Sequence, residues 1–89
     1  MQIRQQDNKF IGCEAGDCGH IEYRQRASTL EILSTYVPPA LRGGGRAAEL
    51  TRYALRYARA NDLQVKPVCS YTRRFLQQHH ADYADLLEH

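Results

Sequence analysis

Hydrophobic and polar residues mostly alternate along the first half of the chain, for instance over residues 19–24 and again over 30–33. This period is typical of a strand that has one covered face and one wet face. Turn-forming residues separate the short runs, so strands are predicted over residues 9–14, 19–25 and 29–37, with a hairpin loop at 14–17. Three such strands in succession predict an antiparallel meander.

The pattern changes after Pro38 and Pro39, which cannot donate ladder hydrogen bonds and therefore end the third strand. From Ala47 onward, apolar residues recur at helical spacing while arginines occupy the other side, which predicts a helix over residues 45–61. A β-prone run over 63–68 stops near Pro67, and residues 71–78 and 83–87 predict further helical turns. The predicted order is βββαβα, an α+β fold.

Length and composition indicate one globular domain, since the chain has 89 residues, of which 43% are hydrophobic and 25% charged. We expect this domain to span residues 1–86, because residues 87–89 resemble the start of a vector-derived histidine tag. No apolar run approaches the roughly 20 residues that cross a bilayer, and the N-terminus lacks the apolar stretch of a signal peptide. The sequence therefore predicts a cytoplasmic protein without a membrane partner.

The cysteines number three, at positions 13, 18 and 69, and an odd count does not form a complete disulfide framework. We expect free thiols, in agreement with a reducing compartment. Cys13, Cys18 and His20 lie close in sequence, but the four-residue gap and the lack of a fourth ligand argue against zinc. No metal site is predicted.

The net charge of +2 is too small to indicate a general nucleic-acid partner, but its distribution is uneven. Between Arg42 and Arg59 five arginines accompany a single acid, Glu49, so this stretch can attract phosphates. Nucleic-acid binding through the arginine face is kept only as an alternative interpretation. It predicts an affinity for DNA or RNA that depends steeply on salt.

The loop Arg42-Gly43-Gly44-Gly45-Arg46-Ala47 joins the predicted third strand to the central helix. Backbone N–H groups at a helix start have no partner within the helix, and glycines let the backbone approach an anion closely. The loop is therefore suited to bind phosphate, although an isolated glycine triplet more often only joins two elements. Its spacing matches neither the P-loop nor the dinucleotide-binding fingerprint.

Arg42, Gly45 and Ala47 give this loop the form Arg-x-x-Gly-x-Ala, which resembles the coenzyme A loop of the GCN5-related N-acetyltransferases. Pro67-Val68-Cys69 resembles the Pro-x-Cys motif of a very short branch of that superfamily, and the resemblance covers roughly residues 9–86. It implies a truncated acetyltransferase core whose last strand runs parallel beside the central helix. It also implies acetyl-coenzyme A as the cofactor.

The resemblance further implies where this cofactor lies. Its pantetheine arm would pair with the backbone near two residues, Tyr36 and Val37. Its pyrophosphate and adenosine phosphate would be held by Arg42, Gly43, Gly44, Gly45, Arg46 and Ala47.

Catalytic groups are fewer than in larger relatives. The family often has a His-Thr pair where this chain has Ser34-Thr35, and Ser34 cannot replace histidine as a base at neutral pH. The helix after the last strand offers Phe75 and Leu76 where larger relatives often have a tyrosine, so that acid is expected to be absent. Cys69 is the catalytic candidate: it would donate a proton or accept the acetyl group, and simple packing of a buried cysteine is the equal alternative.

The leading hypothesis is an acetyl-coenzyme A-dependent N-acetyltransferase that acts on an unidentified amine. The alternative is a non-catalytic acyl-coenzyme A-binding or regulatory module, because the chain stops before the strands that shape an acceptor site in full-length relatives. Neither the amine nor the oligomeric state follows from the sequence.

Overall fold

The computed structural model describes residues 1–87 and contains five strands, three helices and two short 3-10 turns. The strands are β1 (Gln2–Gln6), β2 (Lys9–Glu14), β3 (Asp17–Arg26), β4 (Thr29–Tyr36) and β5 (Gln64–Pro67). The helices are α1 (Arg46–Ala60), α2 (Ser70–Gln78) and α3 (His80–Tyr83), and the 3-10 turns are η1 (Pro39–Leu41) and η2 (Ala84–Leu86). None of these helices is long and apolar enough to cross a membrane.

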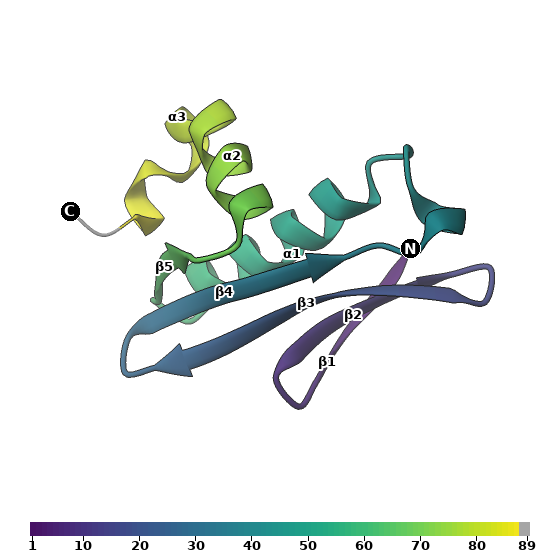
Figure 1. The fold of residues 1–89 in the computed structure, drawn as a ribbon. Helices are drawn as coiled ribbons and strands as arrows, with labels where there is room; N and C mark the ends of the chain where they lie inside the picture. The colour runs from purple at the N-terminus through teal and green to yellow at the C-terminus, as the bar shows by residue number, and fades with distance from the viewer. Residues whose placement is uncertain (88–89) are drawn as a thin grey trace.

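The strands form one sheet in chain order, with β1 to β4 antiparallel and β5 parallel to β4. A parallel neighbour needs a long crossover, and α1 supplies it (Figure 1). The predicted α+β architecture, with a meander, a central helix and one parallel strand, is confirmed.

The prediction of a three-stranded meander is wrong by one strand, because β1 adds a fourth antiparallel strand at the edge of the sheet. β1 has the sequence QIRQQ, in which Ile3 alone is partly buried. An edge strand needs one paired neighbour and little covered surface, so its sequence carries almost no alternation of apolar and polar residues.

The β2–β3 hairpin contains the second correction, since Cys13 and Cys18 are joined by a disulfide rather than being free thiols. Its two-residue turn, Ala15 and Gly16, has positive φ at both positions (53° and 86°), the geometry of a tight hairpin. This turn sets Cys13 directly opposite Cys18, with their Cα atoms 4.1 Å apart. Residues in such closely spaced cross-strand pairs have their side chains close together. The argument that free thiols indicate a reducing compartment therefore no longer holds.

The core lies between one face of the sheet and the helices, which all cover that face (Figure 1). The sheet and α1 supply its fully buried side chains, namely Phe10, Ile21, Leu30, Ile32, Leu50, Ala54, Leu55, Ala58 and Val65. From α2, Phe75 and Leu76 close the layer over β4 and β5. Both α1 and α2 contact β4 on this face of the sheet.

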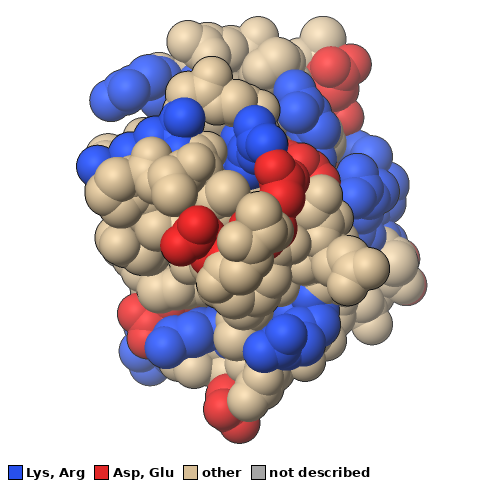
Figure 2. Space-filling view, turned by 90° about the vertical axis from the view of Figure 1, so that its right-hand side faces the viewer, with Lys and Arg blue, Asp and Glu red and all other residues tan. Residues whose placement is uncertain are grey.

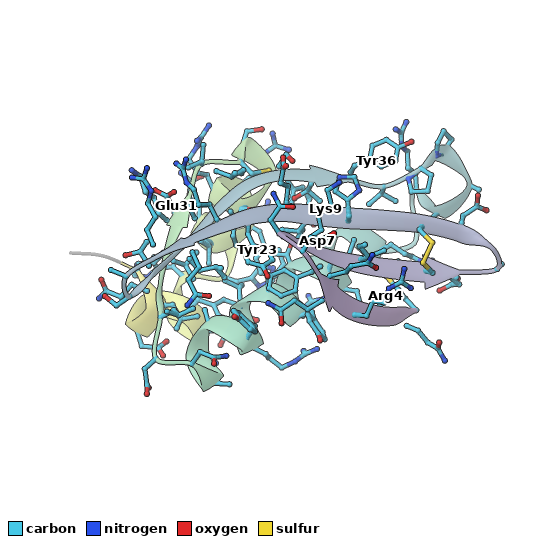
Figure 3. All side chains as sticks on the ribbon, turned by 90° about the horizontal axis from the view of Figure 1, so that it is seen from below. Arg4, Asp7, Lys9, Tyr23, Glu31 and Tyr36 are labelled. Atoms are coloured by element: carbon cyan, nitrogen blue, oxygen red, sulfur yellow. A yellow bond between two sulfur atoms is a disulfide. The ribbon has the colours of Figure 1, made fainter. Side chains whose placement is uncertain are left out.

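The other face of the sheet carries polar and charged side chains, among them Lys9, Glu31 and Tyr36 (Figure 3). Glu31 is buried there, and its carboxylate accepts a 2.6 Å hydrogen bond from Nε of Arg24. This hydrogen bond is the main reason that the pKa of Glu31 is lowered, with support from the charges of Arg26 and Lys66. Seen from the end of the molecule that carries the β2–β3 hairpin, basic and acidic side chains are interspersed (Figure 2).

Candidate functional site

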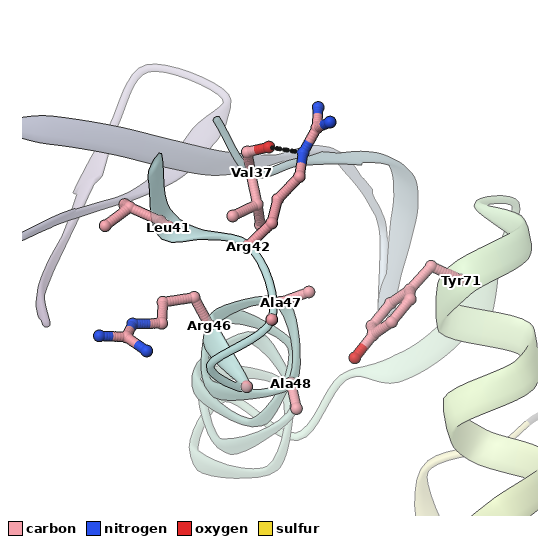
Figure 4. A pocket seen from close by; sticks show the side chains of 9 residues that line it. Val37, Leu41, Arg42, Arg46, Ala47, Ala48 and Tyr71 are labelled. Carbon is pink, nitrogen blue, oxygen red and sulfur yellow. Dashed lines mark hydrogen bonds between the residues drawn. The ribbon is translucent and has the colours of Figure 1, made fainter. Parts of the chain in front are cut away.

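A hollow of about 240 Å³ lies at the start of α1 (Figure 4). Its lining comes from the chain after β4, from the glycine-rich loop, from the first turn of α1 and from α2. The lining residues are Val37, Leu41, Arg42, Gly43, Gly45, Arg46, Ala47, Ala48 and Tyr71. Six of the eight residues predicted to bind the cofactor are in this set, and Tyr36 and Gly44 are not.

The loop backbone depends on glycine at two positions. Gly43 has φ of 84°, and Gly45, the residue that precedes α1, has φ of 78°. Both values lie in the left-handed region that favours glycine. A Cβ at either position would meet no atom within 4 Å, so the requirement is one of backbone conformation rather than space.

The start of α1 presents unpaired donors. Its first intrahelical hydrogen bond runs from the N–H of Glu49 to the carbonyl of Gly45, at 3.0 Å. The preceding N–H groups of residues 46–48 have no acceptor within the helix, and the helix dipole places partial positive charge there. The backbone at this end of the hollow is therefore suited to receive an anion.

The two arginines of the loop differ in how their charges are used. Arg42 is exposed, and its Nε donates a 2.8 Å hydrogen bond to the carbonyl of Val37 (Figure 4). Arg46 forms an ion pair with Glu14 of β2 and donates a second hydrogen bond to the carbonyl of Gly44, at 3.1 Å. The hydrogen bond from Arg46 is the main cause that lowers the pKa of Glu14. The charge of Arg46 is thus balanced within the protein, whereas that of Arg42 faces solvent.

Cys69 lies where β4 and β5 part. The ladder between these strands ends at Ile32 opposite Pro67, and the N–H groups of Val68 and Cys69 both donate to the carbonyl of Ile32, at 3.0 and 2.9 Å. Cys69 is also the residue that precedes α2. Its thiol is half-buried between the two elements.

The Cys69 thiol is surrounded by hydrogen-bond donors. Its Sγ is 3.5 Å from Oγ1 of Thr35 on β4. Burial acts to raise its pKa, but the contact with the Thr35 hydroxyl and the backbone N–H groups of Thr72 and Tyr71 outweigh burial. The pKa of Cys69 is therefore lowered, as is typical of thiols at helix N-termini.

The match to known proteins agrees with this geometry. The model of the GCN5-related N-acetyltransferase family matches residues 9–86. The chain belongs to the GCN5-related N-acetyltransferase family. Its structure is also similar to the NMR structure of a GCN5-like protein from Staphylococcus aureus that is proposed to be an N-acetyltransferase, with a TM-score of 0.77 and 28% sequence identity over 98% of this chain and 87% of that one. A search of curated proteins finds no significant match.

The family assignment and the fold predicted from the sequence are thus confirmed. The roles of the eight loop and strand residues and of Cys69 remain predictions. The structure brings Val37, the glycine-rich loop and the start of α1 to one hollow. Tyr71 lies in the wall of this hollow, and Cys69 precedes Tyr71 by two residues.

Tyr71 is the site residue that sequence reasoning missed. The tyrosine of larger relatives is expected at Phe75 or Leu76, but one helical turn earlier Tyr71 directs its ring toward the start of α1 (Figure 4). Burial is the main cause that raises its pKa, so the hydroxyl keeps its proton at neutral pH. The signal was available in the sequence as the spacing of four residues between Tyr71 and Phe75.

No group of three or more metal-ligating side chains occurs within residues 1–87. While the disulfide is intact, Cys13 and Cys18 are not available as thiolates.

Proposed function

We propose that this chain binds acetyl-coenzyme A at the hollow and transfers its acetyl group to an amine. The observation that carries the proposal is the start of α1: its first residues, whose N–H groups have no acceptor within the helix, line the hollow together with Tyr71 of α2. Membership in an acetyltransferase family supports this interpretation of an otherwise general anion site.

The pyrophosphate is assigned to the backbone of residues 43–47, where positive φ angles at Gly43 and Gly45 expose the N–H groups. Arg42 adds a solvent-facing charge for a phosphate. Arg46 contributes through its backbone N–H, since its side chain is paired with Glu14.

The pantetheine arm is assigned to the stretch of β4 near Tyr36 and Val37. The β5 ladder pairs only with residues 29–32 of β4, so the later residues have no β5 neighbour on that side. An extended amide chain can pair with such a free edge, as peptides do with exposed sheet edges. This path leads the thioester toward Cys69 and Tyr71.

The acetyl transfer itself needs a proton donor for the departing thiolate and a neutral amine. The Tyr71 hydroxyl is protonated and lies on the wall of the hollow, so we assign it as a donor candidate beside Cys69. The amine remains unassigned.

The proposal is tested first by calorimetry and by NMR titration with acetyl-coenzyme A. Amide shifts are expected at Gly43, Gly44, Gly45, Arg46 and Cys69. Arg42→Gln should weaken binding roughly tenfold, the effect of losing one charge-assisted hydrogen bond of about 1.4 kcal/mol. Arg56→Gln is the matched control, because Arg56 is an exposed arginine of α1 beyond the hollow, with its guanidinium over Tyr53.

Absence of shifts at millimolar acetyl-coenzyme A would contradict the proposal. Binding without acetylation of any member of an amine panel, above the uncatalysed rate, would instead favour the non-catalytic acyl-coenzyme A-binding module.

A further inference from the structure

Two arginines extend the walls of the hollow by one helical turn. Ala48 of α1 and Tyr71 of α2 lie on its two walls (Figure 4). Residues three or four positions apart share one face of a helix. Arg52 therefore continues the side of α1 that carries Ala48, and Arg74 continues the side of α2 that carries Tyr71. Each helix that lines the hollow thus places an arginine one turn beyond it.

Contacts between the two helices fix the position of Arg52. Its guanidinium carbon lies 5.4 Å from the centre of the Phe75 ring of α2. That ring is 6.4 Å from the ring of Tyr71. Burial raises the pKa of Tyr71, and the charges of Arg52 and Arg74 act in the opposite direction. Both guanidinium groups are therefore within electrostatic reach of the phenol that lines the hollow.

The charges of Arg52 and Arg74 are not balanced within the protein. Both residues are exposed, and among residues 1–87 no ion pair joins either of them to an acidic side chain. Arg59, on the same side of α1 as Arg52, differs in this respect, because it forms an ion pair with Asp85 at 2.8 Å. Two like charges on neighbouring helices repel each other, and an anion that contacts both would offset that repulsion.

We propose that Arg52 and Arg74 form a second phosphate subsite, which receives the ribose 3′-phosphate of acetyl-coenzyme A. The inference rests on the proposed function and adds the specificity for the cofactor, since the protein then selects coenzyme A over 3′-dephospho-coenzyme A. It also divides the exposed arginines of α1 into two groups. Arg56, whose guanidinium lies over Tyr53, is outside the subsite.

The chemistry of this phosphate suits a pair of arginines. The 3′-phosphate is a monoester that carries nearly two negative charges at neutral pH. A guanidinium presents a planar fork of N–H donors that matches phosphate oxygens. Two arginines from different helices can therefore bind one such phosphate from two sides and balance its charge.

The position of Arg52 along α1 agrees with the same assignment. The pyrophosphate is assigned to the backbone of residues 43–47, and one ribose separates it from the 3′-phosphate in the cofactor. Arg52 follows Ala47 by five residues, which is about 7.5 Å along the helix axis. This separation is comparable with the size of one ribose. Backbone donors would thus hold the pyrophosphate, and side-chain charges would hold the monoester beside it.

The test is calorimetry of the whole protein with acetyl-coenzyme A and with acetyl-3′-dephospho-coenzyme A. We expect the wild type to bind acetyl-coenzyme A about 25-fold more tightly, because each exposed arginine contributes a factor of about five. Arg52→Gln and Arg74→Gln should each weaken binding of acetyl-coenzyme A about fivefold. Neither change should alter the affinity for the 3′-dephospho compound.

Two further variants serve as controls. Arg56→Gln removes an exposed arginine of the same helix and should bind both compounds as the wild type does. Arg42→Gln should weaken both compounds equally, because the pyrophosphate that Arg42 is assigned to contact is common to them. Thermal unfolding of each variant checks that the fold is kept.

The outcomes separate the two proposals. Equal affinity of the wild type for the two compounds, or an equal loss for both in Arg52→Gln, would overturn the subsite and leave the proposed function standing. A preference that disappears in Arg42→Gln but persists in Arg52→Gln and Arg74→Gln would assign the 3′-phosphate to the loop and overturn the subsite as well. Absence of binding of acetyl-coenzyme A would overturn both proposals.

Discussion

Single residues of the glycine-rich loop have separate tasks. Gly43 and Gly45 are required for their positive φ angles, whereas a Cβ at Gly44 would overlap the guanidinium of Arg46. That guanidinium ties the loop to Glu14 of β2. The three glycines therefore shape the backbone at two points and leave room for one side chain between them.

Gly43→Ala is expected to weaken acetyl-coenzyme A binding several-fold, because alanine in the left-handed region costs about 1–2 kcal/mol and the loop would relax from its binding geometry. Gly16→Ala is the matched control, since Gly16 has φ of 86° and open space around it but lies in the β2–β3 hairpin. Both variants should lose similar stability in thermal unfolding, and Gly43→Ala alone should lose affinity by calorimetry. Equal affinity of the two would contradict the assignment of the loop.

How far the site was predictable differs from residue to residue. The loop was found because its chemistry follows from residue types in one short stretch. The pairing of Arg46 with Glu14 joins residues 32 positions apart, which no local pattern reports. Tyr71 lies one turn before the positions at which the family resemblance predicts a tyrosine, and only its place in the wall of the hollow singles it out.

The helices and strands also divide into those that a local sequence pattern predicts and those that depend on pairing with distant residues. The boundaries of β2, α1 and α2 agree closely with the sequence because their hydrophobic periods are strong. β1 is a polar edge strand that is defined by its pairing with β2. The disulfide follows from the register of the β2–β3 hairpin, which depends on the two-residue turn at the centre of the predicted loop 14–17.

The disulfide is expected to contribute about 2 kcal/mol to the free energy of unfolding, the loop-closure estimate for so short a loop. The Cys13→Ser/Cys18→Ser variant should therefore lose about this amount in urea denaturation. Reductant should lower the stability of the wild-type protein to that of the variant and leave the variant unchanged. A reductant effect of equal size on both would exclude the disulfide as its origin.

At the scale of the whole molecule, one sheet face carries the helices and the other carries charge. The helices α1 and α2 both lie on the covered face, and residues of their first turns line the same hollow. Three carboxylates stabilise the outer surface through arginine partners: Glu31 with Arg24 within the sheet, Glu14 with Arg46 at the loop, and Asp85 with Arg59 near the C-terminus.

These three ion pairs predict acid sensitivity. The pKa of each carboxyl is lowered, chiefly by the hydrogen bond from its arginine. A carboxyl with a lowered pKa in the folded state adds stability that is fully present above its unfolded value, roughly 4. That stability is lost as the pH falls through the folded pKa, so the melting temperature should hold near neutral pH and decline below about pH 4.

Glu31→Gln isolates the most buried of the three carboxylates. The variant should melt below the wild type at pH 7, because Arg24, Arg26 and Lys66 then face an uncharged amide. The gap between variant and wild type should close as the pH falls, since protonation removes the same charge from the wild type. High salt should narrow the gap at pH 7 by screening the exposed arginines. A gap that stays constant from pH 7 to 3 would show that Glu31 acts through packing rather than charge.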